Sequence, residues 1–523
     1  MTFVQPFFLF VLLPLAVAAF YAARRVASST VALAVIVVAS LIFYAPYGAP
    51  AMPLLCISLC VNLVIGALLA QPGVRGDRLR WWLLAMGLAF NFLVLAAFKY
   101  LDQLEKLVSP RAAPLLAVAI PAGISFYTFH QAVFLSDAAR RQPDVLKFVK
   151  TWNGPSYAID LFARYAAFVA FLPQLIIGPI TYMSEFGPQI RRETFGRFKI
   201  VNIQVGATLI IVGLFKKLCI ADVIAHHVDP IYDSVATGSP VSQAQAGLAI
   251  LGYFLQLYFD FSGYSDIALG IARLFGIRLP INFDSPLRAT GIVDFYRRWH
   301  ITLTRVIVVF VFTPLSLSGA RFAVKRGYRG WQMRALSAWL PFLANFQVIA
   351  LWHAAKYTFV AFGLIHGLWY VLETEVRASR AFKAYRARTS NGFRTVAGMA
   401  VTGAPLMLTF ALFRSPGLRE FGRLVRAVAG AGGRATTSVQ YPGTADWVLV
   451  IGAALIVYLL PNVYELSRFY RPGIHHFLNA SKTPAVLRAA WRPTLAWGLF
   501  LSLLAAAAYL RLNYSAPFLY GGF

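Results

Sequence analysis

Long stretches without a charged side chain alternate with short basic segments along the whole chain. Residues 1–23 and 26–74 carry no charged residue, and only Arg24 and Arg25 separate them. Further apolar stretches run over 81–98, 112–136, 165–184, 200–215, 234–259, 306–320, 335–355, 357–372, 395–413, 447–464 and 493–510. A helix needs about 20 apolar residues to cross a bilayer, whereas transmembrane strands would show short alternating segments. The pattern therefore predicts an all-α polytopic membrane protein, with 26–74 forming two of its helices.

The order of basic and apolar segments predicts the topology. The first basic pair follows the first apolar stretch, so we expect a retained helix with its N-terminus outside and the loop at 137–158 inside. The next stretch, 165–184, is broken by Pro173 and Pro179, and the loop after it is again basic. We therefore expect 165–184 to re-enter from the cytoplasmic side and to wall a cavity, because non-helical backbone at membrane depth must be buried in protein.

Composition and charge agree with a membrane protein. Hydrophobic residues make up 59% and charged residues 13% of the 523 residues, against roughly 25% charged in soluble proteins. The 48 Lys and Arg against 20 Asp and Glu give a net charge of +28. These basic residues lie in short loops, which is typical of cytoplasmic loops, so we expect a lipid bilayer and no nucleic acid as partner. We interpret the basic stretch 373–394 as a solvated cytoplasmic loop. No linker divides the chain, so we expect a single domain over 1–523.

A polar and aromatic segment over 259–300 interrupts this pattern. It contains the sequence FDFSGYSD at 259–266, with Asp260 and Asp266, and later a cluster of arginines that ends at His300. Two interpretations remain open. The segment is either a surface loop with solvated ion pairs, or a buried, ion-paired scaffold around a site, since charges beside membrane spans must pair or face water. The interleaved aromatic residues favour the scaffold.

Two of the eight histidines lie in apolar surroundings. His130 and His353 could each be a satisfied core group or a functional group, because an ionisable residue at membrane depth is a candidate for function. A neutral imidazole can accept the proton of a hydroxyl that attacks an acyl carbonyl. The pairs at 226–227 and 475–476 are expected to be exposed. No nucleophile elbow, phosphate-binding loop or metal-ligand cluster is present, and we predict no metal site.

Several motifs together resemble the membrane-bound O-acyltransferase family and, more narrowly, its bacterial alginate O-acetyltransferase branch. The resemblance covers nearly the whole chain, and the matching motifs follow one another in the same order. They are PAGISFYTF at 121–129, FLPQ at 171–174, GLFKK at 213–217, FDFSGYSD at 259–266, NF at 282–283, RRWHITLT at 297–304, LWHAA at 351–355, GLIHG at 363–367 and PFLYGGF at 517–523.

This resemblance implies a fold, an activity and a site. The fold is a ring of about eleven helices with re-entrant segments around a central catalytic channel, where a cytoplasmic and an extracytoplasmic funnel meet. His353 matches the catalytic histidine and His300 the second histidine, while Asp260 and Asp266 would support the site. The activity is transfer of an acyl group, most simply acetyl, in the bacterial inner membrane for O-acetylation of an extracytoplasmic polysaccharide.

The resemblance also implies the substrates and partners. The donor would be a cytoplasmic thioester such as acetyl-coenzyme A, used as a substrate with no bound cofactor, and a periplasmic SGNH-type acetyltransferase would be a partner. Transfer of D-alanine from a carrier protein and, in another class, polysaccharide transport remain alternatives. The chain departs from the family over 305–317, where an Arg-Asp pair and a double glycine are missing.

Overall fold

The computed structural model describes residues 1–48, 50–71, 77–108, 120–149, 155–431, 442–474 and 490–519. Residues 112–119 of one apolar stretch, His475, His476 and the last four residues of the C-terminal motif lie outside this part. The helices are α1 Leu13–Val26, α2 Ser29–Tyr44, α3 Ala51–Ala70, α4 Asp77–Val108, α5 Ile124–Ala139, α6 Pro143–Val149, α7 Pro155–Val169, α8 Leu172–Leu175, α9 Met183–Ile190, α10 Ile200–Phe215, α11 Asp222–Thr237, α12 Gln243–Leu274, α13 Ile292–Tyr296, α14 Ile301–Ile307, α15 Thr313–Lys325, α16 Gly330–Arg334, α17 Leu340–His353, α18 Tyr357–Ala378, α19 Arg380–Arg388, α20 Asn391–Arg414, α21 Leu418–Arg426, α22 Thr444–Leu459, α23 Val463–Leu466 and α24 Leu495–Leu510.

Nine helical segments among the described residues are long and apolar enough to cross a membrane. They are Phe8–Val26, Ser29–Tyr47, Ala51–Ala70, Arg78–Leu101, Ile301–Lys325, Gly330–His353, Tyr357–Ala378, Asn391–Arg414 and Leu495–Tyr514. Two of them, Ile301–Lys325 and Gly330–His353, join two helices through a π-helical turn, at Val308–Phe312 and Ala335–Trp339. Within the described ranges the structure forms no sheet, only an isolated bridge between Pro280 and Ile474. The prediction of an all-α polytopic membrane protein is confirmed.

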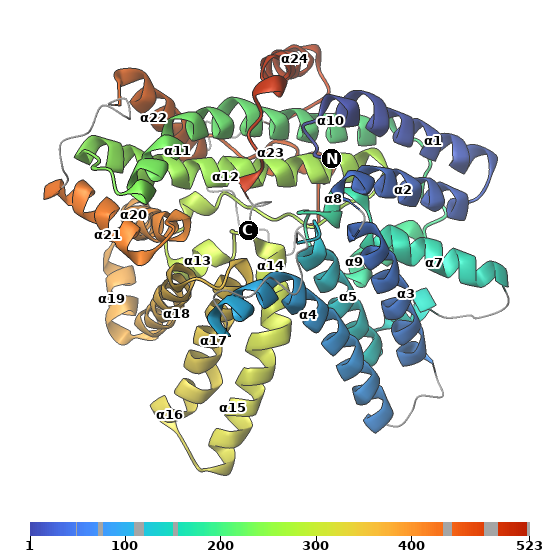
Figure 1. Cartoon of the computed structure of the whole chain (residues 1–523), viewed down its shortest axis with the longest axis horizontal. Coiled ribbons are helices and arrows are strands. Elements are labelled where there is room, and N and C mark those ends of the chain that lie inside the picture. The colour runs from blue at the N-terminus through green and yellow to red at the C-terminus, as the bar shows by residue number, and fades with distance from the viewer. Residues whose placement is uncertain are drawn as a thin grey trace.

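α10 and α12 run side by side across the upper part of the view (Figure 1). The N-terminal helices α1–α9, in blue to cyan, lie to one side of this pair, and the helices from α13 to α22, in yellow to orange, lie to the other side and below. α12 is 32 residues long and buried along almost its whole length. The N-terminal end of the chain lies near the middle of the view.

Glycines allow α10 and α12 to approach closely. A Cβ atom on Gly213 of α10 would lie 2.6 Å from the carbonyl oxygen of Gly263 of α12, and a Cβ on Gly263 would lie 2.8 Å from the oxygen of Gly213. About two helical turns away, Gly206 and Gly270 make the same reciprocal contact. A Cβ on Gly206 would lie 2.9 Å from the carbonyl oxygen of Gly270, and a Cβ on Gly270 would lie 2.7 Å from that of Gly206. Small residues at such spacing let membrane helices pack backbone against backbone. This contact places the residues that follow α10 directly beside the polar segment of α12.

The stretch at 165–184 does not form a spanning helix. α7 ends at Val169, and the chain continues through the single turn of α8 and extended backbone to Tyr182. This backbone is buried and hydrogen-bonded to side chains: the amide of Ile180 donates to Thr302 Oγ1 at 3.1 Å, and the amide of Thr181 donates to His130 Nε2 at 3.1 Å. Protein side chains thus replace the missing helical hydrogen bonds, as membrane depth requires.

The loops on either side of this stretch lie on the same face of the molecule. α6, from the loop before it, packs against α9, which follows it. The guanidinium of Arg24, at the end of α1, donates to the carbonyl oxygens of Phe195 at 2.9 Å and Glu193 at 3.2 Å in the loop after α9. The arrangement supports the predicted re-entry, and the assignment of this face to the cytoplasm remains a prediction.

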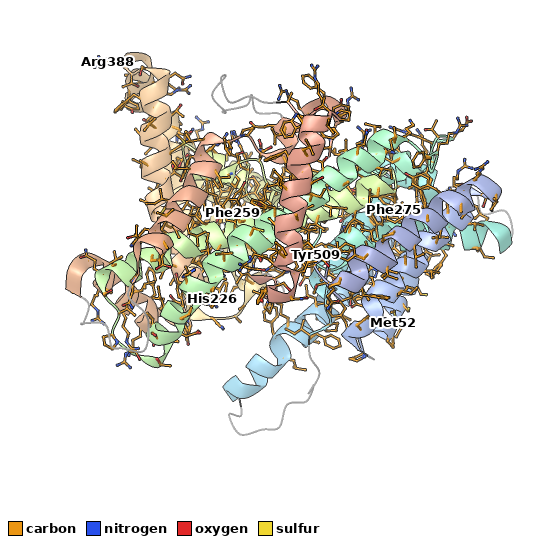
Figure 2. The ribbon with its side chains drawn as sticks, turned by 90° about the horizontal axis from the view of Figure 1, so that it is seen from above. Met52, His226, Phe259, Phe275, Arg388 and Tyr509 are labelled. Carbon is orange, nitrogen blue, oxygen red and sulfur yellow. The ribbon has the colours of Figure 1, made fainter. Side chains whose placement is uncertain are left out.

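The basic stretch 373–394 is helical, which corrects the prediction of a loop. α18 continues to Ala378, α19 follows, and α20 begins at Asn391. The side chains of α19 are largely exposed, so the expected solvation holds. Figure 2 shows Arg388 at the far end of this extension, well away from Phe259 in the middle of the molecule.

Candidate functional site

The histidine predicted to be catalytic lies between two cavities. His353 is the last residue of α17 and is 8% exposed. It lines a larger cavity of about 500 Å³, together with Tyr47, Lys99, Pro121 and other residues. It also lines a smaller cavity of about 30 Å³. His300 lines the smaller cavity as well, so the structure brings the two predicted residues together.

Close packing of α17 against α18 fixes the end of α17. Gly363 and Gly367 of α18 face α17, and a Cβ on Gly363 would lie 3.0 Å from the carbonyl oxygen of Phe346. The His353 ring is enclosed by aromatic side chains. It lies 4.9 Å from the Phe413 ring in an edge-on arrangement and 6.1 Å from the Phe359 ring, which it parallels. These neighbours hold the imidazole in an apolar environment.

Two side chains of α4 cap the carboxyl end of α17. The ammonium of Lys99 donates to the carbonyl oxygen of Trp352 and lies 5.1 Å from the centre of the Trp352 ring. The hydroxyl of Tyr100 donates to the carbonyl oxygen of Leu351 at 2.8 Å. A cation at this position satisfies otherwise unpaired carbonyls and interacts favourably with the helix dipole. Lys99 therefore places a positive charge in the larger cavity and anchors the residue next to His353.

The hydrogen bonds around His300 determine which of its nitrogens carries the proton. His300 Nδ1 lies 3.1 Å from Asn282 Oδ1, and the same oxygen accepts the amide of Thr302 at 3.2 Å and the Thr302 hydroxyl at 2.9 Å. Because an amide oxygen only accepts, Nδ1 is the donor and Nε2 of the neutral ring is unprotonated. The His300 backbone is left-handed, with φ 45° and ψ 50°, just before α14. His300 is thus held by both its backbone and Asn282.

A third buried histidine extends the site, and the sequence analysis did not single it out. His366 Nδ1 is 2.7 Å from the hydroxyl of Tyr296, and the His366 ring stacks on Phe362 with centroids 4.0 Å apart. Tyr296 and Phe362 both line the smaller cavity. The sequence signals for His366 were its position in an apolar stretch and its place in the motif GLIHG at 363–367.

The polar segment of α12 is buried and ion-paired. It is therefore the buried scaffold of the sequence analysis and not a solvated surface loop. Lys217, which follows α10 and is 1% exposed, lies 2.6 Å from Asp260 and 2.8 Å from Asp222. Lys216 lies 2.6 Å from Asp266. The aspartates do not reach the cavity of His353, so their role is to support the surrounding structure.

This charge cluster, formed by Lys217, Asp222 and Asp260, holds the C-terminal segment. The amide of Leu519 donates to Asp260 Oδ2 at 3.1 Å, and the amide of Ala516 donates to Asp222 Oδ2 at 3.2 Å. Between them, the Phe518 ring lies 4.4 Å from the Lys217 ammonium and lines the larger cavity. The aspartates on α12 and α11 thus help to position one wall of that cavity.

Further ion pairs stabilise the end of the polar segment. Arg298 lies 2.8 Å from Asp294 and 3.7 Å from Asp284. Burial raises the pKa of the Asp284 carboxyl above its ordinary value, and the Arg298 guanidinium partly opposes that rise. These pairs fix the loop that precedes His300.

The divergent stretch 305–317 is helical and begins with an ion pair. Arg305 on α14 lies 2.9 Å from Glu185 on α9 and stacks on the Tyr182 ring at 4.4 Å. α14, a π-helical turn at Val308–Phe312 and α15 form one long segment. Arg305 therefore connects the long segment that begins with α14 to the non-spanning stretch 165–184 and to α9.

The other described histidines, His130, His226 and His227, line neither cavity. His130 Nδ1 donates to the carbonyl of Phe126 at 2.8 Å while Nε2 accepts from Thr181, so both nitrogens of this core histidine are satisfied. His226 is exposed as expected, but His227 is only partly exposed and lies 2.7 Å from Asp446, which corrects that expectation. Within the described residues, no three His, Cys, Asp or Glu side chains gather as a metal site requires.

Comparison with known proteins assigns the chain to a family. Residues 157–413 match the model of the membrane-bound O-acyltransferase family. The chain is 31% identical to a peptidoglycan O-acetyltransferase of Helicobacter pylori, over 82% of this chain and 80% of that protein. It is 29% identical to a probable alginate O-acetylase of Azotobacter vinelandii over 99% of both chains. It is 25% identical to a teichoic acid D-alanyltransferase of Streptococcus thermophilus, over 56% of this chain and 67% of that protein. The chain belongs to the membrane-bound O-acyltransferase family and is a multi-pass membrane O-acyltransferase.

Proposed function

We propose that this protein transfers an acetyl group from a cytoplasmic thioester, acetyl-coenzyme A, to a hydroxyl group on the other side of the bacterial inner membrane. The final acceptor is a cell-envelope polysaccharide, reached directly or through a periplasmic SGNH-type acetyltransferase. The observation that carries the proposal is the position of His353, which lines both cavities. Relatives named for O-acetylation match four fifths or more of their own length, which favours acetyl over D-alanyl.

The predicted topology gives the two cavities different substrates. Tyr47 and Pro121, in the larger cavity, lie at helix ends predicted to be outside, so this cavity would receive the acceptor hydroxyl. Tyr296 and His300, in the smaller cavity, lie next to the exposed Arg297, on the predicted cytoplasmic side. A basic residue there would attract the phosphates of the donor. A volume of about 30 Å³ holds about one water molecule, so surrounding aromatic side chains must move aside for the acetyl group.

Proton transfer by His353 would drive the reaction. An imidazole nitrogen accepts the proton as the acceptor oxygen attacks the thioester carbonyl, and the carbon–sulfur bond of the resulting tetrahedral intermediate then breaks. The imidazolium returns the proton to the departing thiolate, so that ester and thiol are the products. Lys99, on the same cavity, would stabilise the negative charge that develops on the carbonyl oxygen. His300, held by Asn282, would orient the donor through its unprotonated Nε2.

The test uses inside-out membrane vesicles supplied with radiolabelled acetyl-coenzyme A on their outer face. Label should accumulate as base-labile ester in the vesicle interior, and His353→Ala should reduce that rate by about 10²–10⁴-fold, the range of general-base catalysis. His226→Ala is the matched control, because this histidine is exposed on α11, away from both cavities. A wild-type rate in a correctly inserted His353→Ala protein would overturn the assignment. Transfer from an acylated carrier protein only, without competition by coenzyme A, would overturn the donor.

The structure gives little support to polysaccharide transport. The cavity that His300 and His353 share holds about one water, which is far too narrow for a polymer. A transporter would also keep its function without the imidazole of His353. The same vesicle experiment separates the two classes, because it measures the covalent ester rather than movement of the polymer.

A further inference from the structure

A large apolar groove lies apart from the two cavities that His353 lines. It has a volume of about 840 Å³ and lies between α1, α10 and α24, with Val17, Ala207 and Ala506 among its lining residues. Tyr21 and Tyr509 are the polar residues of this lining, and all others are apolar. The Tyr21 hydroxyl is already bound, since it donates to the carbonyl oxygen of Leu274 at 2.7 Å. The groove therefore offers almost only van der Waals contact.

The groove follows most of the first spanning segment, Phe8–Val26. Its lining on the first helical segment extends from Leu9 to Tyr21, which corresponds to about 18 Å of helix at 1.5 Å per residue. At the Leu9 end, the rings of Phe10 and Tyr509 meet edge to face with centroids 6.1 Å apart. An acyl chain that enters from the Tyr21 end would thus extend to these rings, near the other end of the spanning segment Phe8–Val26.

The Tyr21 end of the groove is basic. Phe198 lines the groove and is 62% exposed, and its neighbours Arg197 and Lys199 are exposed as well. Arg25, at the end of α1, is the third exposed cation there, and the bonds from Arg24 to Phe195 and Glu193 hold the loop against α1. Exposed cations beside an apolar slot are complementary to a phosphate headgroup whose chains enter the slot.

We propose that this groove binds an anionic phospholipid, with its acyl chains between α1, α10 and α24 and its phosphate between Arg25, Arg197 and Lys199. Inside a bilayer no water covers the groove, so lipid chains fill it, and the cations select the headgroup. α24 packs on α10 and leads into the segment that ends with Phe518 at the larger cavity. The bound lipid thereby supports α24 and, through it, the wall of the catalytic cavity.

Native mass spectrometry of the protein released from nanodiscs tests the proposal, with phosphatidylglycerol and phosphatidylcholine in equal amounts. Wild type should retain phosphatidylglycerol in at least fivefold excess. Ala506→Trp, which fills the groove, should lose most of the bound lipid. Leu503→Trp is the matched control, because Leu503 lies on the same helix, is 69% exposed and does not line the groove.

A second variant tests the headgroup site without touching the helices. The double substitution Arg197→Gln and Lys199→Gln lies in an exposed loop and should keep lipid binding while it abolishes the preference for phosphatidylglycerol. Equal lipid retention by wild type and Ala506→Trp, or an unchanged preference in the double variant, would overturn the proposal. Retention of detergent or of neutral lipid alone would also overturn it. None of these measurements depends on acetyl transfer, so they are independent of the proposed function.

Discussion

Removing the cation of the buried charge cluster should destabilise the protein strongly. Lys217 is the shared partner of Asp260 at 2.6 Å and Asp222 at 2.8 Å, and all three side chains are at most 3% exposed. Lys217→Met preserves most of the side-chain volume but leaves two carboxylates buried without a cation. Breaking a buried ion pair costs about 3–5 kcal/mol, because an uncompensated charge stays in a low-dielectric environment. The ratio of folded to unfolded protein should fall by roughly a hundred- to several-thousand-fold.

The assay is thermal unfolding of the purified protein in detergent, followed by fluorescence-detected size exclusion. Lys216→Met is the matched control, since Lys216 has one carboxylate partner, Asp266, and is 13% exposed. Lys217→Met should lower the apparent Tm more than Lys216→Met does. Asparagine at both 260 and 222 in the Lys217→Met background should recover most of the loss, because no orphan charge then remains. An effect of Lys217→Met no larger than that of Lys216→Met, or no recovery, would refute the reasoning.

Three further predictions follow from the packing, the site and the topology. Gly213→Ala should destabilise the protein by about 1–3 kcal/mol by forcing α10 away from α12, whereas Gly452→Ala, with open space around it, should be neutral in the same melting assay. Lys99→Met should lower kcat for acetyl transfer at least tenfold with little change in KM, because Lys99 is proposed to stabilise charge that develops only during the reaction. An unchanged kcat would show that Lys99 does not have this role. Cysteines at the exposed Arg140 and Arg192 should react only with reagents that reach the cytoplasm, and labelling of either from outside intact cells would contradict the re-entry of 165–184.

Charge-free stretches predicted most spanning helices, because a helix that crosses a membrane must be apolar along its own length, and this can be seen in the local sequence. The stretch 395–413 lies within α20, and 81–98 lies within α4. The charge-free stretch 234–259 ends where the first charged residue, Asp260, follows it. The helix does not end there, because α12 continues to Leu274. Lys217 compensates Asp260 from another helix, and such a pairing between distant parts of the chain cannot be read from a window of sequence. The basic stretch 373–394 was missed for another reason, because charge-free stretches reveal apolar helices only, and α19 is a largely exposed, basic helix.

The site was predictable only in part, because its residues differ in how local their signals are. His353 stands out as an imidazole in an apolar stretch, and the motif around it adds a family resemblance. Lys99 contacts the carbonyl of a residue 253 positions away, so its position at the end of an apolar stretch gave no hint of this role. Asn282 belongs to a motif of the family resemblance, but its role in holding His300 is seen only in the structure. Side chains that orient a site through tertiary contacts require the structure.

The reciprocal glycine contacts between α10 and α12 also determine which parts of the protein can move. Because the backbones of the two helices meet directly at Gly206, Gly213, Gly263 and Gly270, the helices have little room to slide or tilt against each other. Under the proposed function, we therefore expect the donor to enter the smaller cavity through movement of the aromatic side chains that line it, such as Trp299, Phe362 and Phe413. We expect the α10–α12 pair to keep its geometry while those side chains move.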